Sequence, residues 1–244
     1  MLQGAETRLS QDKVEKLAEK FENKEPREIL KWSLDTFHPR LALSSSFSIE
    51  DVALIDMLSK ISPKFRVLTL DTGRLNQETY SLIDRIRMKY NMQIEVYYPN
   101  TASVEKMVRE HGMNLFYESV AHRRLCCNVR KVEPLMRALG GLDAWITGLR
   151  REQSVTRTEV KKVEIDEAHG NIIKINPLAD WSNEQVWDYV KKNDVPYNPL
   201  YDKGYTSIGC EPCTRPIKSG EEVRAGRWWW ESPDEKECGL HVHK

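Results

Sequence analysis

The stretch Leu41-Ala42-Leu43-Ser44-Ser45-Ser46-Phe47-Ser48 decides the fold. Its first three residues form a short apolar run, which predicts a buried strand. The serines that follow are typical of a loop and of a helix N-terminus, and the pattern of residues 49–60 predicts a helix directly after them. This strand–loop–helix order indicates the first step of an α/β fold.

The alternation of strand and helix continues through the middle of the chain. Further strands are predicted at 65–70, 93–98 and 144–149, and helices at 76–90, 101–110 and about 121–139. Such an order favours a parallel twisted sheet with helices on both faces. Two charged helices, 12–22 and 26–37, precede it and could cap the fold or contact a second copy of the chain.

The pattern changes after residue 160. Residues 161–165 and 171–175 flank Ala168-His169-Gly170, and together they predict a β-hairpin. A helix at 182–193 follows, capped by Ser182 with Gln185 behind it.

The last part of the chain has little periodicity. Residues 197–244 are rich in Pro, Gly, Tyr and Trp, so we expect an irregular segment that wraps a metal site and ends in a mobile tail. We therefore divide the chain into an N-terminal helical segment, 1–38, and one domain, 39–244.

Four of the five cysteines form two tight clusters, Cys126-Cys127 and Cys210-Glu211-Pro212-Cys213. Thiolates are soft ligands that select zinc or iron–sulfur clusters, so two pairs predict a four-ligand metal site. Neighbouring residues on a helix do not share a face, which is awkward for one small ion but suits a cluster of several irons. We therefore favour an iron–sulfur cluster over zinc. Buried apolar cysteines or a disulfide are the simpler alternatives.

Overall composition gives no sign of a nucleic-acid or membrane partner, because Lys+Arg and Asp+Glu are both 37. The chain has no apolar run near the ~20 residues of a membrane span, and its N-terminus does not resemble a signal peptide. We expect a cytoplasmic protein, where structural disulfides are rare. Residues 121–157 hold eight basic and three acidic residues, which favours a small anionic ligand over a nucleic acid.

Three polar loops follow predicted strands, where ligands of open α/β sheets bind. The serine loop, residues 44–48, could hold a phosphate or could be an ordinary helix cap. Asp71-Thr72-Gly73 could hold a ribose or a metal, or could cap a turn. Arg150-Arg151 suits bidentate anion binding, with a solvated surface pair as the alternative.

Further candidates lie near or after the cysteines. Lys131 follows Cys127 by four residues and would project from the same side of a helix. Arg224 and Arg227 precede three consecutive tryptophans, which cannot all face one core. Cys238 is the one cysteine outside the clusters, and it could be a nucleophile or an incidental thiol.

These motifs resemble the phosphoadenylyl-sulfate and adenylyl-sulfate reductases of assimilatory sulfate reduction and cysteine biosynthesis. The similarity runs from about residue 40 to 241. It rests on Ser44-Ser45-Ser46-Phe47, Leu70-Asp71-Thr72-Gly73, Lys131-Val132-Glu133-Pro134, Thr147-Gly148-Leu149-Arg150-Arg151-Glu152-Gln153-Ser154 and Glu237-Cys238-Gly239-Leu240-His241. The paired cysteines are similar to the branch that carries a [4Fe–4S] cluster and typically reduces adenylyl sulfate (APS). The branch without them prefers the 3′-phosphorylated substrate (PAPS).

The resemblance implies an adenine-nucleotide α-hydrolase-like fold and a role for each candidate residue. Cys126, Cys127, Cys210 and Cys213 would hold the cluster, and Cys238 would be the nucleophile. The groups around the sulfate end of APS would be Lys131, Arg224, Arg227 and His241. The residues at the adenosine part would be Ser45, Ser46, Phe47, Asp71, Thr72 and Gly73, with Arg150 or Arg151 near the phosphosulfate.

The resemblance also implies the reaction. Cys238 would attack the sulfur of APS, release AMP and form an S-sulfocysteine, from which a second thiol releases sulfite. No spare cysteine is present, and the sequence continues only three residues past His241, without the thioredoxin-like domain of plant-type members. We therefore expect thioredoxin or glutaredoxin as a separate reductant.

Rival functions remain at this point. The nearest is reduction of PAPS or of both substrates. A tRNA-thiolating enzyme of the same superfamily would need ATP, and the serine loop lacks the glycines of the ATP-binding relatives. A zinc-containing nucleic-acid-binding module would give Cys238 no role. Whether the chain forms a homo-oligomer is left open.

Overall fold

The computed structural model describes residues 9–154 and 157–232 of the chain. Within them, the strands that form the sheet are β1 (Leu41–Ser44), β2 (Val67–Leu70), β3 (Ile94–Tyr97), β4 (Ala144–Ile146), β5 (Val163–Asp166) and β6 (Ile172–Ile175). Their order in the sheet is β3-β2-β1-β4-β6-β5. The pairs β1–β2, β1–β4 and β4–β6 are parallel, whereas β5 is antiparallel to β6. The predicted α/β class with a parallel sheet is confirmed.

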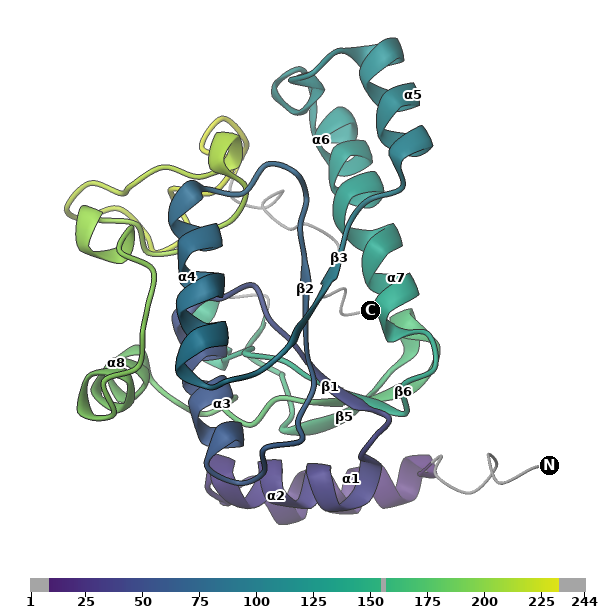
Figure 1. Cartoon of the computed structure of the whole chain (residues 1–244), viewed down its shortest axis with the longest axis vertical. Helices are drawn as coiled ribbons and strands as arrows, with labels where there is room; N and C mark the ends of the chain where they lie inside the picture. Colours follow the sequence, from purple (N-terminus) through teal and green to yellow (C-terminus); the bar gives the residue numbers. More distant parts are fainter. Residues whose placement is uncertain (1–8, 155–156, 233–244) are drawn as a thin grey trace. The chain divides into compact units, whose positions relative to one another are not determined.

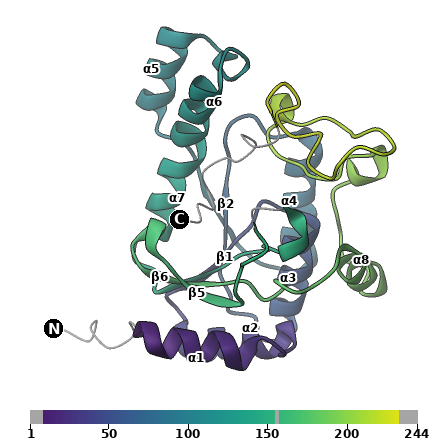
Figure 2. The same ribbon diagram turned by 180° about the vertical axis from the view of Figure 1, so that it is seen from behind.

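The α-helices follow the predicted order with small shifts at their ends. They are α1 (Gln11–Phe21), α2 (Pro26–Phe37), α3 (Ile49–Ser59), α4 (Gln77–Lys89), α5 (Thr101–His111), α6 (Val120–Cys127), α7 (Glu133–Leu139) and α8 (Asn183–Lys192). The strands and these helices can be followed in Figure 1, and Figure 2 shows them from behind. None of the described helices is long and apolar enough to cross a membrane.

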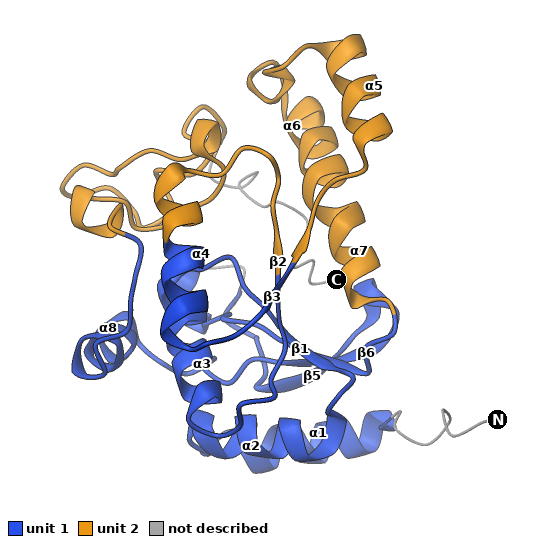
Figure 3. Ribbon diagram, in the orientation of Figure 1, with its two compact units in different colours: residues 1–68, 82–95, 141–198 blue, residues 69–81, 96–140, 199–244 orange. Residues whose placement is uncertain are grey.

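Contact clustering divides the chain into two compact units, coloured separately in Figure 3. Unit 1 comprises Met1–Leu68, Leu82–Glu95 and Gly141–Asn198, and unit 2 comprises Thr69–Ser81, Val96–Gly140 and Pro199–Lys244. The division of the sequence at residues 38 and 39 stays a proposal.

Unit 1 is built on the central strands. β1 is buried along Leu41–Leu43, and α2 packs against it and against α3. Each helix start has the chemistry that the sequence indicates: Pro26 begins α2, and Ser48 and Ser182 cap α3 and α8 in reciprocal capping boxes. The predicted hairpin is confirmed as β5–β6, and Gly170 at its turn has φ +87°, where a side chain would be strained.

Unit 2 contains the basic segment that the sequence predicts as one helical stretch over 121–139. It is helical in three pieces, because five π-helical residues, Asn128–Val132, separate α6 from α7. Pro134 is the second residue of α7 and has no N–H to donate to the preceding turn, and its ring would collide with a regular α-helical carbonyl. A widened turn before the proline avoids that collision.

Candidate functional site

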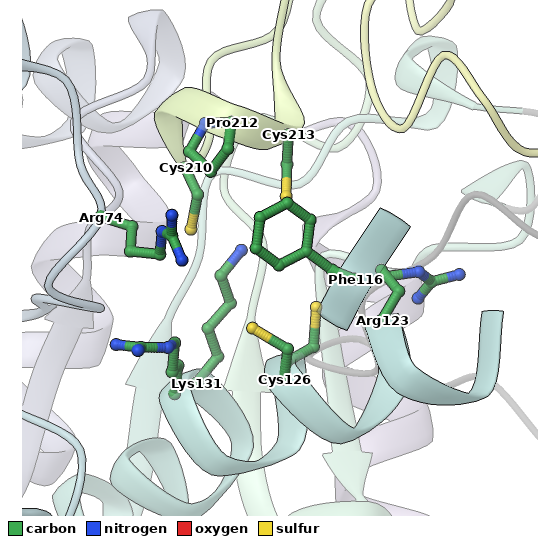
Figure 4. A pocket seen from close by; sticks show the side chains of 10 residues that line it. Arg74, Phe116, Arg123, Cys126, Lys131, Cys210, Pro212 and Cys213 are labelled. Atoms are coloured by element: carbon green, nitrogen blue, oxygen red, sulfur yellow. The ribbon is translucent and has the colours of Figure 1, made fainter. Parts of the chain in front are cut away.

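The four clustered cysteines come together in the core of unit 2. Cys126 and Cys127 end α6, and Cys210 and Cys213 bound a 3-10 turn, Glu211–Cys213. All four are buried free thiols in one apolar cluster that also contains Phe116. Figure 4 shows the hollow that they share, with about 320 Å³ of space between its atoms, part of it open to solvent. It is lined by Arg74, Phe116, Arg123, Cys126, Cys127, Arg130, Lys131, Cys210, Pro212 and Cys213.

Local hydrogen bonds give the Cys210–Cys213 turn its shape. The Cys213 N–H donates to the Cys210 carbonyl at 3.0 Å, and the Thr214 hydroxyl donates to the same carbonyl at 3.0 Å. Tyr117 Oη donates to the Pro212 carbonyl at 2.8 Å. The two sulfurs of this turn therefore face the hollow from a fixed backbone.

Basic side chains surround these thiols. Arg130 and Arg227 are 9% and 8% exposed, and neither has a carboxylate partner among the described residues. Arg130 Nη1 donates to the Thr72 carbonyl at 2.7 Å, and Arg227 Nη1 to Ser207 Oγ at 3.3 Å. In the described part of the chain, the Nε atoms of both arginines are buried without a hydrogen-bond partner, as is Trp228 Nε1. The core of unit 2 thus carries positive charge and N–H donors that have no acceptor among the described residues.

Nearby cations lower the pKa values of the thiols, whereas burial raises them. Burial, together with the nearby Cys210, raises the pKa of Cys213 to about 12. Burial likewise raises the pKa of Cys126 against the opposing charge of Arg130. Burial of Cys210 is outweighed by the charge of Lys131 and the hydroxyl of Thr72, so its pKa is lowered. Of Cys126, Cys210 and Cys213, Cys210 is therefore the thiol most readily converted to a thiolate ligand.

The predicted Asp71-Thr72-Gly73 loop belongs to the same unit as the cysteines. Thr72 Oγ1 lies 3.3 Å from Cys210 Sγ. Asp71 Oδ1 accepts from the Gly73 N–H at 2.8 Å and from Tyr80 Oη at 2.9 Å. Burial and this bond to Asp71 raise the pKa of Tyr80 to about 12. Asp71 thus caps its own turn, while Thr72 contacts the cysteine site.

The serine loop lies in unit 1 and is organised by Asp51. Asp51 Oδ2 accepts from the Ser46 N–H at 2.7 Å, from Ser46 Oγ at 2.9 Å and from the Ser48 N–H at 3.3 Å. Ser45 is buried and its Oγ accepts from the Phe47 N–H at 3.0 Å. Phe47 is buried with φ +58°, a left-handed conformation that turns the chain into α3. The Ser45 N–H donates to the Leu68 carbonyl at 2.8 Å, so the amides of residues 45–48 all have acceptors within the chain, and the helix-cap alternative describes Ser48.

Arg150 and Arg151 also have acidic partners within unit 1. Arg150 forms a buried pair with Glu50 at 2.9 Å, and Gln153 Nε2 donates to the same carboxylate at 2.9 Å. Arg151 binds Glu22 through both Nη atoms at 2.7 and 2.9 Å. Anion binding by either arginine stays a prediction.

Of the remaining candidates in unit 2, two lie among the described residues and two lie outside them. Lys131 lines the hollow, and Arg224 is half-buried. Cys238 and His241 lie outside the described residues.

Sequence reasoning did not single out Arg123, Arg130 or Arg74 as site residues, and it named Trp228 only within the 228–230 run, part of which it expected to line a site or an interface. The first two could have been found, because they stand three before and four after Cys126 and share its side of a helix. Arg74 and Trp228 reach the site through tertiary contacts that carry no local signal.

Comparison with known proteins places this geometry among sulfonucleotide-reducing proteins. The family model described as "Phosphoadenosine phosphosulfate reductase domain" matches residues 40–216. A Burkholderia cepacia protein named adenosine 5'-phosphosulfate reductase is 54% identical over 84% of this chain and 82% of its own length. An Allochromatium vinosum protein of the same name is 51% identical over 82% of this chain and 78% of its own.

Solved structures agree on the fold. The chain is similar to a phosphoadenylyl-sulfate reductase from Candida auris, with a TM-score of 0.74, 34% identity, and coverage of 85% of this chain and 98% of the other. An NH3-dependent NAD synthetase from Campylobacter jejuni is similar in fold alone, with a TM-score of 0.50 and 10% identity over 80% of this chain and 79% of the other. The predicted adenine-nucleotide α-hydrolase-like fold is thereby confirmed.

The carboxyl group that organises the serine loop should make stability depend on pH. Burial raises the pKa of Asp51 from 3.8 to about 6, against the opposing bond from the Ser46 N–H. The folded chain therefore keeps this proton longer than the unfolded chain, and its stabilisation is lost as the pH rises from about 4 through 6. Relative to Asp51→Asn, wild type should lose about 2–3 kcal/mol of unfolding free energy over that range.

Urea unfolding at several pH values measures this difference. The exposed Asp84→Asn on α4 controls for the loss of one carboxylate. A wild-type minus Asp51→Asn difference that does not change with pH would contradict the assignment.

Proposed function

We propose that this chain, which belongs to the phosphoadenosine phosphosulfate reductase domain family, reduces APS to sulfite and AMP with electrons from a thioredoxin-type protein. The observation that carries the choice of substrate is the shared hollow of four cysteines in a chain 54% and 51% identical to proteins named for APS. The Candida auris structure named for PAPS is 34% identical, which keeps PAPS or dual use as the second candidate. A tRNA-thiolating activity is the more distant alternative.

The four cysteines fit a [4Fe–4S] cluster better than a single ion. Among residues 9–154 and 157–232, no three His, Cys, Asp or Glu side chains are grouped as one metal ion would need. A cluster takes one thiolate on each of several irons, so its ligands need not converge on one point. When bound, it supplies a compact anionic group whose sulfurs accept N–H hydrogen bonds. The residues that would hold it are Cys126, Cys127, Cys210 and Cys213.

The unpaired donors around the hollow support an anionic occupant. Burying a guanidinium without a counter-charge is costly, and Arg130 and Arg227 have no carboxylate among the described residues. Thiolates at the four cysteines would neutralise them. Lys131 already hydrogen-bonds Cys210, so its ammonium would face both the cysteine site and an anion beside it.

The substrate contacts follow from the family resemblance and stay proposals. In unit 2, Lys131, Arg224, Arg227 and His241 would bind the sulfate end, and Asp71-Thr72-Gly73 the adenosine part. In unit 1, Ser45, Ser46 and Phe47 would contact the adenosine part, and Arg150 or Arg151 the phosphosulfate. Their cationic groups would offset the charge that develops on the departing phosphate and on the sulfonate oxygens.

The proposed chemistry places bond formation at Cys238. Its thiolate attacks the sulfur of APS, and the sulfur–oxygen bond to the phosphate breaks, so that AMP leaves with the electron pair. A thiolate of the partner then attacks Cys238 Sγ and releases sulfite, forming a mixed disulfide. The second thiol of the partner closes its own disulfide and restores the Cys238 thiolate. The partner thus supplies the two electrons.

Substrate choice is tested by turnover of APS and PAPS with thioredoxin at low substrate concentration. We expect kcat/KM for APS to exceed that for PAPS by at least about tenfold, because that ratio needs only ~1.4 kcal/mol of differential transition-state binding. Turnover with a strong preference for PAPS would refute the choice of APS.

The nucleophile is tested by Cys238→Ser. Wild type incubated with sulfur-labelled APS and no reductant should accumulate protein-bound label that added thioredoxin releases as sulfite. The serine variant should bind no label, because an alcohol of ordinary pKa is a weak nucleophile. Label that stays covalently bound to the variant would remove Cys238 from this role.

The cofactor is tested by metal and sulfide analysis of anaerobically purified protein. We expect about four iron and four acid-labile sulfides per chain and visible absorption from the thiolate-bound cluster. Cys213→Ala should lose most of the absorption, whereas Ser207→Ala, next to Arg227, should keep it. A colourless wild-type protein that contains only zinc would overturn the proposal.

A further inference from the structure

Glu231, close to the end of the described chain, is paired with a buried arginine. Its carboxylate accepts from Arg123 Nε at 2.9 Å and from Arg123 Nη2 at 2.7 Å. The Arg123 and Glu231 side chains are 0% and 2% exposed. Cys238 follows only seven positions later in the sequence. We infer that the Arg123–Glu231 pair anchors the start of the segment that carries Cys238. Arg123 and Glu231 are then positioning residues for the transfer of the sulfonate group to Cys238, and this inference rests on the proposed function.

Contacts around Trp228 hold the same segment in place. Two guanidinium groups contact its ring, with the Cζ atoms of Arg123 and Arg227 at 4.7 and 4.6 Å from its centroid. The backbone N–H of Trp228 donates to the Cys213 carbonyl at 3.2 Å, and the backbone N–H of Glu231 donates to the Trp228 carbonyl at 2.8 Å. Glu231 is therefore fixed through its backbone as well as its carboxylate.

The energetics of the pair indicate a geometric role. Removing two charges from water costs several kcal/mol per ion, and well-packed apolar residues often replace a buried pair without loss of stability. What apolar residues do not supply is the directional, bidentate bond that fixes one backbone position against another. Because Arg123 belongs to α6 and Glu231 follows it by 108 positions, the bond joins distant segments of unit 2.

The same guanidinium also reaches the cysteine site. Arg123 hydrogen-bonds Cys127 in addition to Glu231. It therefore joins one of the proposed cluster ligands to the starting point of the Cys238 segment. Arg215–Glu221 is also a bidentate pair in unit 2, but among the described residues it lacks this second contact. Its side chains are 31% and 29% exposed, and it joins residues only six positions apart.

The anchor limits where Cys238 can go. Seven residues span at most about 25 Å, whereas ten residues from the backbone bond at Trp228 span about 35 Å. A longer tether lowers the effective concentration of the thiol, and loss of orientation lowers the rate further. The pair should therefore matter for the transfer step more than for substrate affinity.

The experiment uses the full-length holoprotein with Glu231→Gln, and Glu221→Gln as the matched control. Single-turnover transfer of label from saturating APS should slow by about tenfold in Glu231→Gln, with the APS dissociation constant within about twofold of wild type. The control should match wild type in both. Iodoacetamide labelling of Cys238, read from the C-terminal peptide by mass spectrometry, should be slowed by AMP in wild type and in the control, but not in Glu231→Gln.

A second variant separates positioning from folding. Arg123→Met with Glu231→Leu should melt near wild type, because apolar residues can replace a buried pair, yet it should show the same slow transfer and lost AMP protection. A folded double variant with wild-type transfer and protection would overturn the inference. So would a Glu231→Gln protein whose iron content and APS affinity fall together with its rate. Failure of wild type to form S-sulfocysteine would instead reject the proposed function, and the alkylation comparison would still judge the anchor.

Discussion

Buried positive charge among thiols is the constraint on which unit 2 depends. Arg123, Arg130 and Arg227 are nearly inaccessible, and they lie with four cysteines in or beside one apolar core. Glu231 neutralises Arg123, but the described residues provide no carboxylate for the other two. Such charges are costly to bury alone, which supports the proposal that the cysteines supply the missing negative charge as thiolates when they hold a cluster. At Cys210 the charges of Lys131 and Arg227 and the hydroxyl of Thr72 outweigh burial and lower the pKa of the thiol, which favours the thiolate.

In unit 1, the buried positive charge is neutralised by carboxylates of the same unit. Its buried Arg150 is neutralised by Glu50, and Arg151 is paired with Glu22 at the end of α1. Asp51 accepts the free donors of the serine loop. A unit whose buried polar groups are already satisfied has little need of a ligand to stabilise it, whereas unit 2 has donors left over. The contrast explains why the case for a resident cofactor rests on unit 2.

The sequence predicted the fold well where one local signal decided the structure. Apolar runs such as Leu41–Leu43, and helix-start residues such as Pro26 and Ser182, act over a few positions and were interpreted correctly. The π-helical turn before Pro134 was not predicted, because a proline within a helical pattern can kink, end or widen the helix. The bond between Thr72 and Cys210 spans 138 positions, and no periodicity could have indicated it.

The position of Cys126 and Cys127 at the end of α6 explains how two adjacent cysteines can line one hollow. Inside a regular helix, consecutive side chains diverge by about 100°, so two neighbours would not be expected to line one hollow. Here both stand in the last turn of α6, directly before the π-helical residues, and both line the hollow, as does Lys131 from the widened turn. Because consecutive helical side chains diverge by about 100°, we expect their sulfurs to enter it from different directions. That arrangement is poor for one tetrahedral ion and suits an acceptor with several separate binding points, as an iron–sulfur cluster has.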